Sequence, residues 1–211
     1  MAHNGIEKHV LTEISKIMAI IVKERTERYN ISVYPEIELS IELLWQKENL
    51  FKRLLKQINY VGLLCGFENK DGEWCWLIAN DEIHMGNEYG IFREYENKNA
   101  RLHSFTMNPS TIVNLKQICF AAYYNRFEYD DSWERTKAEL QIKTSNNESI
   151  VIPFGDNYEE RSCCFVCSFE IGENNIITVN PKMEFAENMF DLVTKYGWKE
   201  LECNDHETYE H

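Results

Sequence analysis

Apolar residues fall in short, evenly spaced runs through the second half of the chain. The first run, 115–124, is almost unbroken, and shorter runs follow at 138–144, 150–154, 163–171 and 176–179, with Asn, Asp, Gly and Ser between them. Short strands separated by turn residues at this spacing are typical of an antiparallel β-sandwich. The pattern therefore predicts a mainly β fold for this half of the chain.

The first half of the chain also contains strand patterns. Residues 36–43 alternate between apolar side chains and Glu or Ser, which predicts a half-buried strand with an acidic outer face. Two further apolar runs, 61–67 and 74–78, flank the pair Asp71-Gly72. An Asp-Gly pair between apolar runs indicates a β-hairpin turn.

Three segments have the spacing of amphipathic helices. Over 6–29, apolar residues recur at intervals of three and four, and charged residues occupy the other faces. The segment 184–196 has the same spacing and is followed by Gly197, in the place of a helix C-cap glycine. A third such pattern, 46–58, carries four basic residues. The N-terminal helix is expected to pack on its own sheet or on a second copy.

The expected fold class is therefore mainly β, an antiparallel β-sandwich with an N-terminal amphipathic helix and a short C-terminal helix. The expected organisation is an N-terminal helix within 1–30, a β-sandwich over 31–200 and an acidic tail over 201–211.

The composition narrows the possible partners. The 211 residues are 44% hydrophobic, enough for a sizeable core, and the net charge is −13 with a pI near 5.0. Binding a nucleic-acid backbone needs a basic surface, so nucleic acid is not an expected partner. The acidity favours either simple solubility or a basic protein partner.

Cysteine use and the N-terminus bear on the compartment. The chain has seven cysteines, an odd number, and most lie on apolar segments, which favours free buried thiols in a reducing cytoplasm. The first residues lack the pattern of a signal peptide, and the apolar runs are too short to span a membrane. We expect a cytoplasmic protein with no integral membrane segment.

One cysteine cluster has a spacing that some metal sites use. Cys164 and Cys167 form a Cys-x-x-Cys pair, but the sequence has no second ligand pair at comparable spacing, which a zinc site requires. On a regular strand Cys163 and Cys167 share one face and Cys164 points to the other. These cysteines are interpreted as buried small hydrophobic residues.

No catalytic motif stands out. The sequence lacks a Gly-x-Ser-x-Gly elbow, a phosphate-binding loop, a dinucleotide-binding motif and a His-Glu-x-x-His motif. One enzymatic hypothesis stays open, a cysteine nucleophile at Cys65 or Cys75 paired with His84 or His103.

Residues Leu63 to Trp198, about two-thirds of the chain, resemble a divergent member of the TerD/TerA family of bacterial tellurium-resistance and stress-response proteins. The resemblance is carried by the strand 118–124 with small residues before aromatics, by the cysteine-bearing strand 163–170, and by an ending that consists of Phe185, Asp191, Tyr196, Gly197 and Trp198. It implies the β-sandwich already expected from the strand pattern, and a role in stress response.

The resemblance also bears on calcium. Family members that bind calcium carry an Asp-Leu-Asp motif on an early strand and an acidic loop after it. Here the early position, 59–63, has no aspartate, and the later segment, 94–99, offers only Glu94 and Glu96. Calcium takes about 6–8 oxygen ligands. The calcium site is therefore expected to be lost or much weakened, with Glu94 and Glu96 as its remaining candidate metal ligands.

Two functional hypotheses follow beside the enzymatic one. In the first, the chain is a non-enzymatic TerD/TerA-like protein, with no cofactor, that acts through contacts with a protein partner or with itself. In the second, it is an acidic immunity or inhibitor protein that neutralises a basic partner, because charge complementarity accelerates association.

Overall fold

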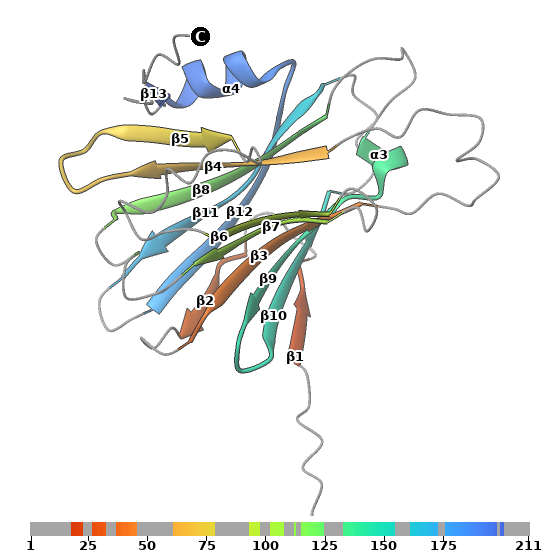
Figure 1. Ribbon diagram of the computed structural model, residues 1–211, viewed down its shortest axis with the longest axis vertical. Coiled ribbons are helices and arrows are strands. Elements are labelled where there is room, and N and C mark those ends of the chain that lie inside the picture. The colour runs from red at the N-terminus through yellow and green to blue at the C-terminus, as the bar shows by residue number, and fades with distance from the viewer. Residues whose placement is uncertain are drawn as a thin grey trace, which may run out of the picture.

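The computed structural model (Figure 1) describes the chain at residues 18–22, 27–32, 37–45, 61–78, 93–97, 102–107, 112, 115–124, 133–154, 161–172, 176–197 and 199–200. Structural statements below concern these residues.

Strands dominate the described residues and form two sheets. The six-stranded sheet has the order β1 (Met18–Ile21), β10 (Glu148–Pro153), β9 (Glu139–Thr144), β3 (Leu39–Leu44), β7 (Leu102–Met107) and β6 (Arg93–Asn97). The seven-stranded sheet has the order β13 (Lys199–Glu200), β5 (Trp74–Ile78), β4 (Val61–Glu68), β8 (Gln117–Tyr124), β11 (Cys163–Ile171), β12 (Ile176–Ala186) and β2 (Tyr29–Ser32). All pairings are antiparallel except β1 with β10 and β13 with β5. The mainly β, antiparallel prediction is confirmed.

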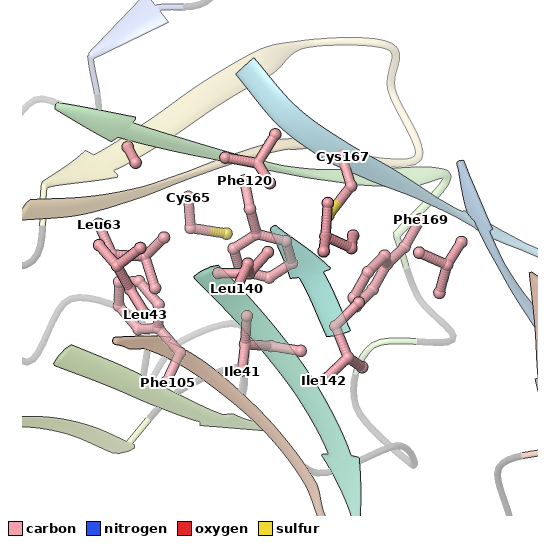
Figure 2. Packing of buried hydrophobic residues seen from close by; sticks show 14 of the residues in the cluster. Ile41, Leu43, Leu63, Cys65, Phe105, Phe120, Leu140, Ile142, Cys167 and Phe169 are labelled. Carbon is pink, nitrogen blue, oxygen red and sulfur yellow. The ribbon is translucent and has the colours of Figure 1, made fainter. Parts of the chain in front are cut away.

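One hydrophobic core joins the two sheets. Along β3 the side chains of Leu39, Ile41 and Leu43 are fully buried, while Glu42 between them is only half-buried. Figure 2 shows side chains of β4, β8 and β11 pointing toward those of β3, β7 and β9 across this core. The alternation predicted for 36–43 is therefore confirmed over 39–43, because successive residues of a strand face opposite sides, whereas residue 36 lies outside the described residues.

A helix covers part of the outer face of the seven-stranded sheet. Helix α4 (Met189–Tyr196) lies beside this sheet (Figure 1) and buries Leu192 in a second apolar cluster that includes Phe165. The side chain of Asn188 caps its first turn, and Gly197 ends it at a φ of 65°, a left-handed conformation that glycine adopts without strain. The predicted C-terminal helix is confirmed, but residues 184–186 belong to β12 and the helix starts later.

Trp133 connects the two sheets at one end of the core. It starts the short helix α3 (Trp133–Thr136) and is fully buried. Its ring packs against Tyr124 at the end of β8 and against Phe154 just beyond β10, with ring centroids 4.9 and 5.0 Å away. Its indole N–H donates to the carbonyl oxygen of Arg161 at 2.8 Å.

The prediction of an N-terminal helix is wrong wherever the structure describes that segment. Residues Met18–Ile21 form β1 and Tyr29–Ser32 form β2, whereas 1–17 and 23–26 lie outside the described residues. The consecutive β-branched residues Ile20-Ile21-Val22 favour a strand. Pairing with β10 satisfies the backbone groups on one side of β1, and this long-range contact outweighs the helical spacing.

The facing predicted for the cysteines of β11 is also wrong. Cys164 and Cys167 both belong to the core between the sheets, and Phe165 belongs to the outer cluster. The register shifts between Phe165 and Cys167 against both neighbouring strands, which is a β-bulge. The extra residue places Cys167 on the same side as Cys164.

Several expectations fall outside what the structure describes. The helical pattern 46–58 and the acidic tail 201–211 are not described, and the boundaries expected at residues 30 and 200 stay predictions. No helix within the described residues is long and apolar enough to cross a membrane.

Candidate interaction surface

The most distinctive surface lies where one edge of each sheet comes together. Strand β1 ends the six-stranded sheet and pairs only with β10, and β2 ends the seven-stranded sheet and pairs only with β12, as far as the described residues go. Val22 extends the first pairing by donating its backbone N–H to the carbonyl oxygen of Val151 at 2.9 Å. The side of the molecule formed by β1 and β2 is called the open edge below.

A hollow of about 180 Å³ separates the two strands of the open edge. Four isoleucines supply its apolar lining, and Glu148 is its one charged lining residue among those described. The lining consists of Ile20, Asn30, Ile31, Ser32, Ile142, Glu148, Ser149 and Ile150. Asn30 is held in place by the hydroxyl of Thr178, which donates to its side-chain oxygen at 3.0 Å. The hollow thus has an apolar floor and a polar rim.

Exposed apolar side chains gather at the same edge. Among the described residues four large hydrophobic side chains are exposed, namely Ile20 (45%), Ile21 (60%), Ile176 (38%) and Phe190 (78%). Ile20 and Ile21 lie on β1, and Ile176 pairs with Ser32 of the hollow. Ile20 faces the hollow and Ile21 the opposite side of β1, so both faces of this edge strand expose an aliphatic side chain, which singles out β1 as a surface for another molecule.

The residues expected to contribute to a calcium site lie elsewhere. Glu94 and Glu96 are on β6, at the far end of the six-stranded sheet, where their backbones pair with Phe105 and His103. Their side chains are outside what the structure describes. No group of three or more His, Cys, Asp or Glu side chains that could hold a metal is found among the described residues. The calcium expectation therefore stays a prediction.

The side chains proposed for cysteine chemistry have structural roles where they are described. Cys65 is fully buried, and burial raises the pKa of its thiol well above the ordinary value, so the nucleophilic thiolate is scarce at neutral pH. His103 is also fully buried, and its Nδ1 accepts the backbone N–H of Leu63 at 3.2 Å. The side chain of Cys75 and all of His84 lie outside the described residues.

The bond from Leu63 to His103 crosses from one sheet to the other. Leu63 belongs to β4 and His103 to β7, and Leu63 lies just before the residues of β4 that pair with β5. The imidazole accepts this buried N–H, which would otherwise need another acceptor. Because Nδ1 accepts, the ring proton of the neutral imidazole lies on Nε2. His103 thus fastens the two sheets together inside the core.

The cysteine side chains that the structure describes are buried free thiols. Cys65, Cys119, Cys163, Cys164 and Cys167 are all buried, and none forms a disulfide. Burial raises the pKa of the Cys163 thiol to about 12. These side chains fill space in the two apolar clusters or beside them.

The sequence analysis missed the open edge. Its surface depends on β1 lying parallel to β10, a pairing between residues that are far apart in the chain. The available signal was the run Ile20-Ile21-Val22, in which adjacent β-branched residues are better suited to a strand than to a helix.

Comparison with known proteins places the fold. No protein-family model matches the sequence, and a search of the curated proteins gives no match. Among solved structures, a protein of unknown function, SAV2460, superposes with a TM-score of 0.58 at 7% identity, over 79% of this chain and 99% of that protein. SCO6318 from Streptomyces coelicolor A3(2), a homologue of the telluride resistance protein TerD, superposes with a TM-score of 0.51 at 5% identity, over 74% of this chain and 94% of that protein. The chain therefore has a divergent TerD-like fold.

Proposed function

We propose that this chain is a non-enzymatic β-sandwich protein of the TerD type that acts by binding another protein through its open edge. The observation that carries the proposal is the exposure of Ile20 and Ile21 on the edge strand β1, beside the hollow. The TerD-like fold supports a role in tellurium resistance, because one fold relative is described as a homologue of the telluride resistance protein TerD. The family resemblance of the sequence adds stress response to this role.

The physical argument rests on solvent exposure. Burial of apolar surface stabilises an association by roughly 25 cal/mol per Å². The exposed Ile20 and Ile21 and the apolar hollow beside them therefore offer a partner a source of binding energy, and the polar residues Asn30, Ser32 and Glu148 could orient it. The buried thiol of Cys65, with its raised pKa, favours binding over cysteine catalysis.

The proposal also includes a lost or weakened calcium site and a cytoplasmic location. The calcium site of the family is lost or weakened in this chain, since Glu94 and Glu96 alone provide too few oxygen ligands. The protein works in the cytoplasm, in keeping with five buried free cysteines among the described residues. Titration with calcium, followed by calorimetry and thermal melting, tests the first point, because a bound ion would raise the melting temperature.

The experiment compares two variants in affinity purification from the native host. The double variant Ile20→Lys/Ile21→Lys places two positive charges on the open edge, and the control Phe190→Lys places one on the exposed face of α4. Proteins enriched by the wild type and by Phe190→Lys, but lost with the double variant, support the proposal. If the double variant folds normally by circular dichroism and retains every partner, the open edge is not the binding surface.

A second candidate function rests on the net charge of −13. An acidic immunity or inhibitor protein would bind a basic partner mainly through long-range attraction, which salt screens. Capture of the partner should then weaken steeply between low and moderate salt concentration. Capture through apolar contacts at the open edge should change little over the same range.

A further inference from the structure

We propose that β1 accepts an extended segment of the partner as an additional strand of the six-stranded sheet, and that this segment carries consecutive aliphatic residues together with basic ones. The inference rests on the proposed function and deepens it, because it names how the partner binds and what kind of sequence it presents.

The first step concerns the backbone of β1. A strand at a sheet edge presents unpaired N–H and C=O groups on its free side, and natural proteins usually protect such edges with charged residues, proline or a bulge. Met18–Ile21 contains no charge and no proline, and its pairing with β10 is regular over all four residues. Within the described residues, no strand pairs with its other side. The edge is therefore suited to strand addition.

The second step concerns the side chains on either side of β1. Ile20 lines the hollow, and Ile21, the next residue, points to the opposite face of the strand. Both are exposed, at 45% and 60%. A strand added beside them would meet an apolar neighbour on each face. Consecutive aliphatic residues in the incoming segment would contact both Ile20 and Ile21. A segment that strictly alternates apolar and polar residues would make an apolar contact on only one face.

The third step concerns the volume of the hollow. About 180 Å³ corresponds to roughly six water molecules at ~30 Å³ each. This is the space of one aliphatic side chain and not of a folded element. The hollow is therefore suited to a single side chain projecting from an added strand, between Ile20 of one sheet and Ile31 of the other.

The fourth step concerns charge. Glu148 lines the hollow and pairs with Met18 at the start of β1, and the chain as a whole carries −13. Arg28, next to β2, is already engaged with Glu170 at 3.9 Å. An incoming segment with Lys or Arg next to its aliphatic residues gains attraction, whereas a second copy of this chain brings a further −13 and is repelled. The occupant is thus a basic extended segment of another protein.

The experiment uses a displayed library of random 12-residue peptides, selected on the wild-type chain and in parallel on Ile20→Lys/Ile21→Lys. Peptides enriched on the wild type should combine adjacent Val, Ile or Leu residues with Lys or Arg. Their affinity should fall about tenfold or more for the double variant and stay unchanged for Phe190→Lys. Ile21→Thr retains a β-branched side chain and should give a smaller loss of peptide affinity. It provides a test that does not depend on whether the double variant folds.

Backbone methylation then distinguishes strand addition from side-chain docking. Two versions of the best peptide carry N-methyl groups on alternate residues, in opposite registers. If the peptide adds a strand to β1, the register that faces β1 loses about tenfold or more in affinity and the other register retains it, because only alternate N–H groups donate to the neighbouring strand.

Each other outcome overturns the inference in a recognisable way. Equal binding of both methylated registers, with loss in the double variant, refutes strand addition and leaves the open edge as a binding surface. If the selected peptides bind the double variant as tightly as the wild type, the open edge is not the binding surface. The same conclusion follows if no peptide is enriched more strongly on the wild type than on the double variant. A dimer that sedimentation detects in the wild type and not in the double variant identifies a second copy as the occupant.

Discussion

Replacement of Trp133 by alanine should be among the most destabilising single changes in this protein. The side chain is fully buried and lies between Tyr124 of one sheet and Phe154 beside the other. Truncation of a buried Trp to alanine costs about 3–5 kcal/mol, because the surrounding structure only partly fills the cavity. For a domain of this size that loss corresponds to a fall in melting temperature of roughly 6–20 °C.

A milder variant separates packing from hydrogen bonding. Trp133→Phe retains an aromatic ring against Tyr124 and Phe154 and removes the indole N–H that donates to the carbonyl oxygen of Arg161. Loss of that bond costs about 1 kcal/mol, with a further cost for the smaller ring. Trp133→Phe should therefore lie between the wild type and Trp133→Ala in stability.

The assay is urea unfolding followed by far-ultraviolet circular dichroism, with the slope m compared between variants. Phe190→Ala is the matched control, because Phe190 is an aromatic residue that is 78% exposed, and its truncation should change stability by less than about 0.5 kcal/mol. If Trp133→Ala is no less stable than Phe190→Ala, Trp133 does not fasten the two sheets and the reasoning fails.

Three further predictions test other contacts. His103→Phe leaves the N–H of Leu63 without its acceptor and should cost about 1–3 kcal/mol in urea unfolding, whereas His103→Asn keeps an acceptor near Nδ1 and should cost less. Gly62→Ala places a Cβ 2.3 Å from Cζ of Tyr123, closer than van der Waals contact allows, so it should destabilise, and a double-mutant cycle with Tyr123→Ala should give a coupling of about 0.5–3 kcal/mol. Hydrogen bonds from Lys195 and Tyr196 lower the pKa of Glu184. Their stabilisation should therefore be complete above the ordinary pKa near 4.5 and be lost as the pH falls through the lowered pKa. Glu184→Gln should show a smaller loss of stability between pH 7 and pH 3, and an equal loss would contradict this.

Local patterns predicted the elements that depend on neighbours in the sequence. The alternation along 36–43 gave the buried face of β3, Asp71-Gly72 gave the hairpin between β4 and β5, and Gly197 gave the end of α4. At Gly72 the observed φ of 84° is the conformation that such a turn demands. In these places the local preference and the final structure agree, so the sequence alone was sufficient.

The failures occurred where distant contacts decide the structure. The spacing of Met18 and Ile21 fits a helical stripe, and only the pairing of β1 with β10 makes these residues a strand. The bulge between Phe165 and Cys167 depends on the registers of two neighbouring strands, which no local pattern contains. The open edge needs both β1 and β2 in place, so a sequence prediction that had made this segment a helix could not have found it.

The parallel pairing of β1 with β10 also has a consequence for biosynthesis. Met18 pairs with Glu148, and Ser32 of β2 pairs with Ile176. The two N-terminal strands therefore cannot pair until these later parts of the chain have been translated. At about 5–20 residues per second, the ribosome needs roughly 6–26 s to proceed from the first strand to its neighbour. During that interval Ile20 and Ile21 are exposed on a nascent chain without a sheet to join. The six-stranded sheet can therefore fold completely only after the second half of the chain has been translated. In a chain interrupted before Glu148, β1 has no β10 to pair with.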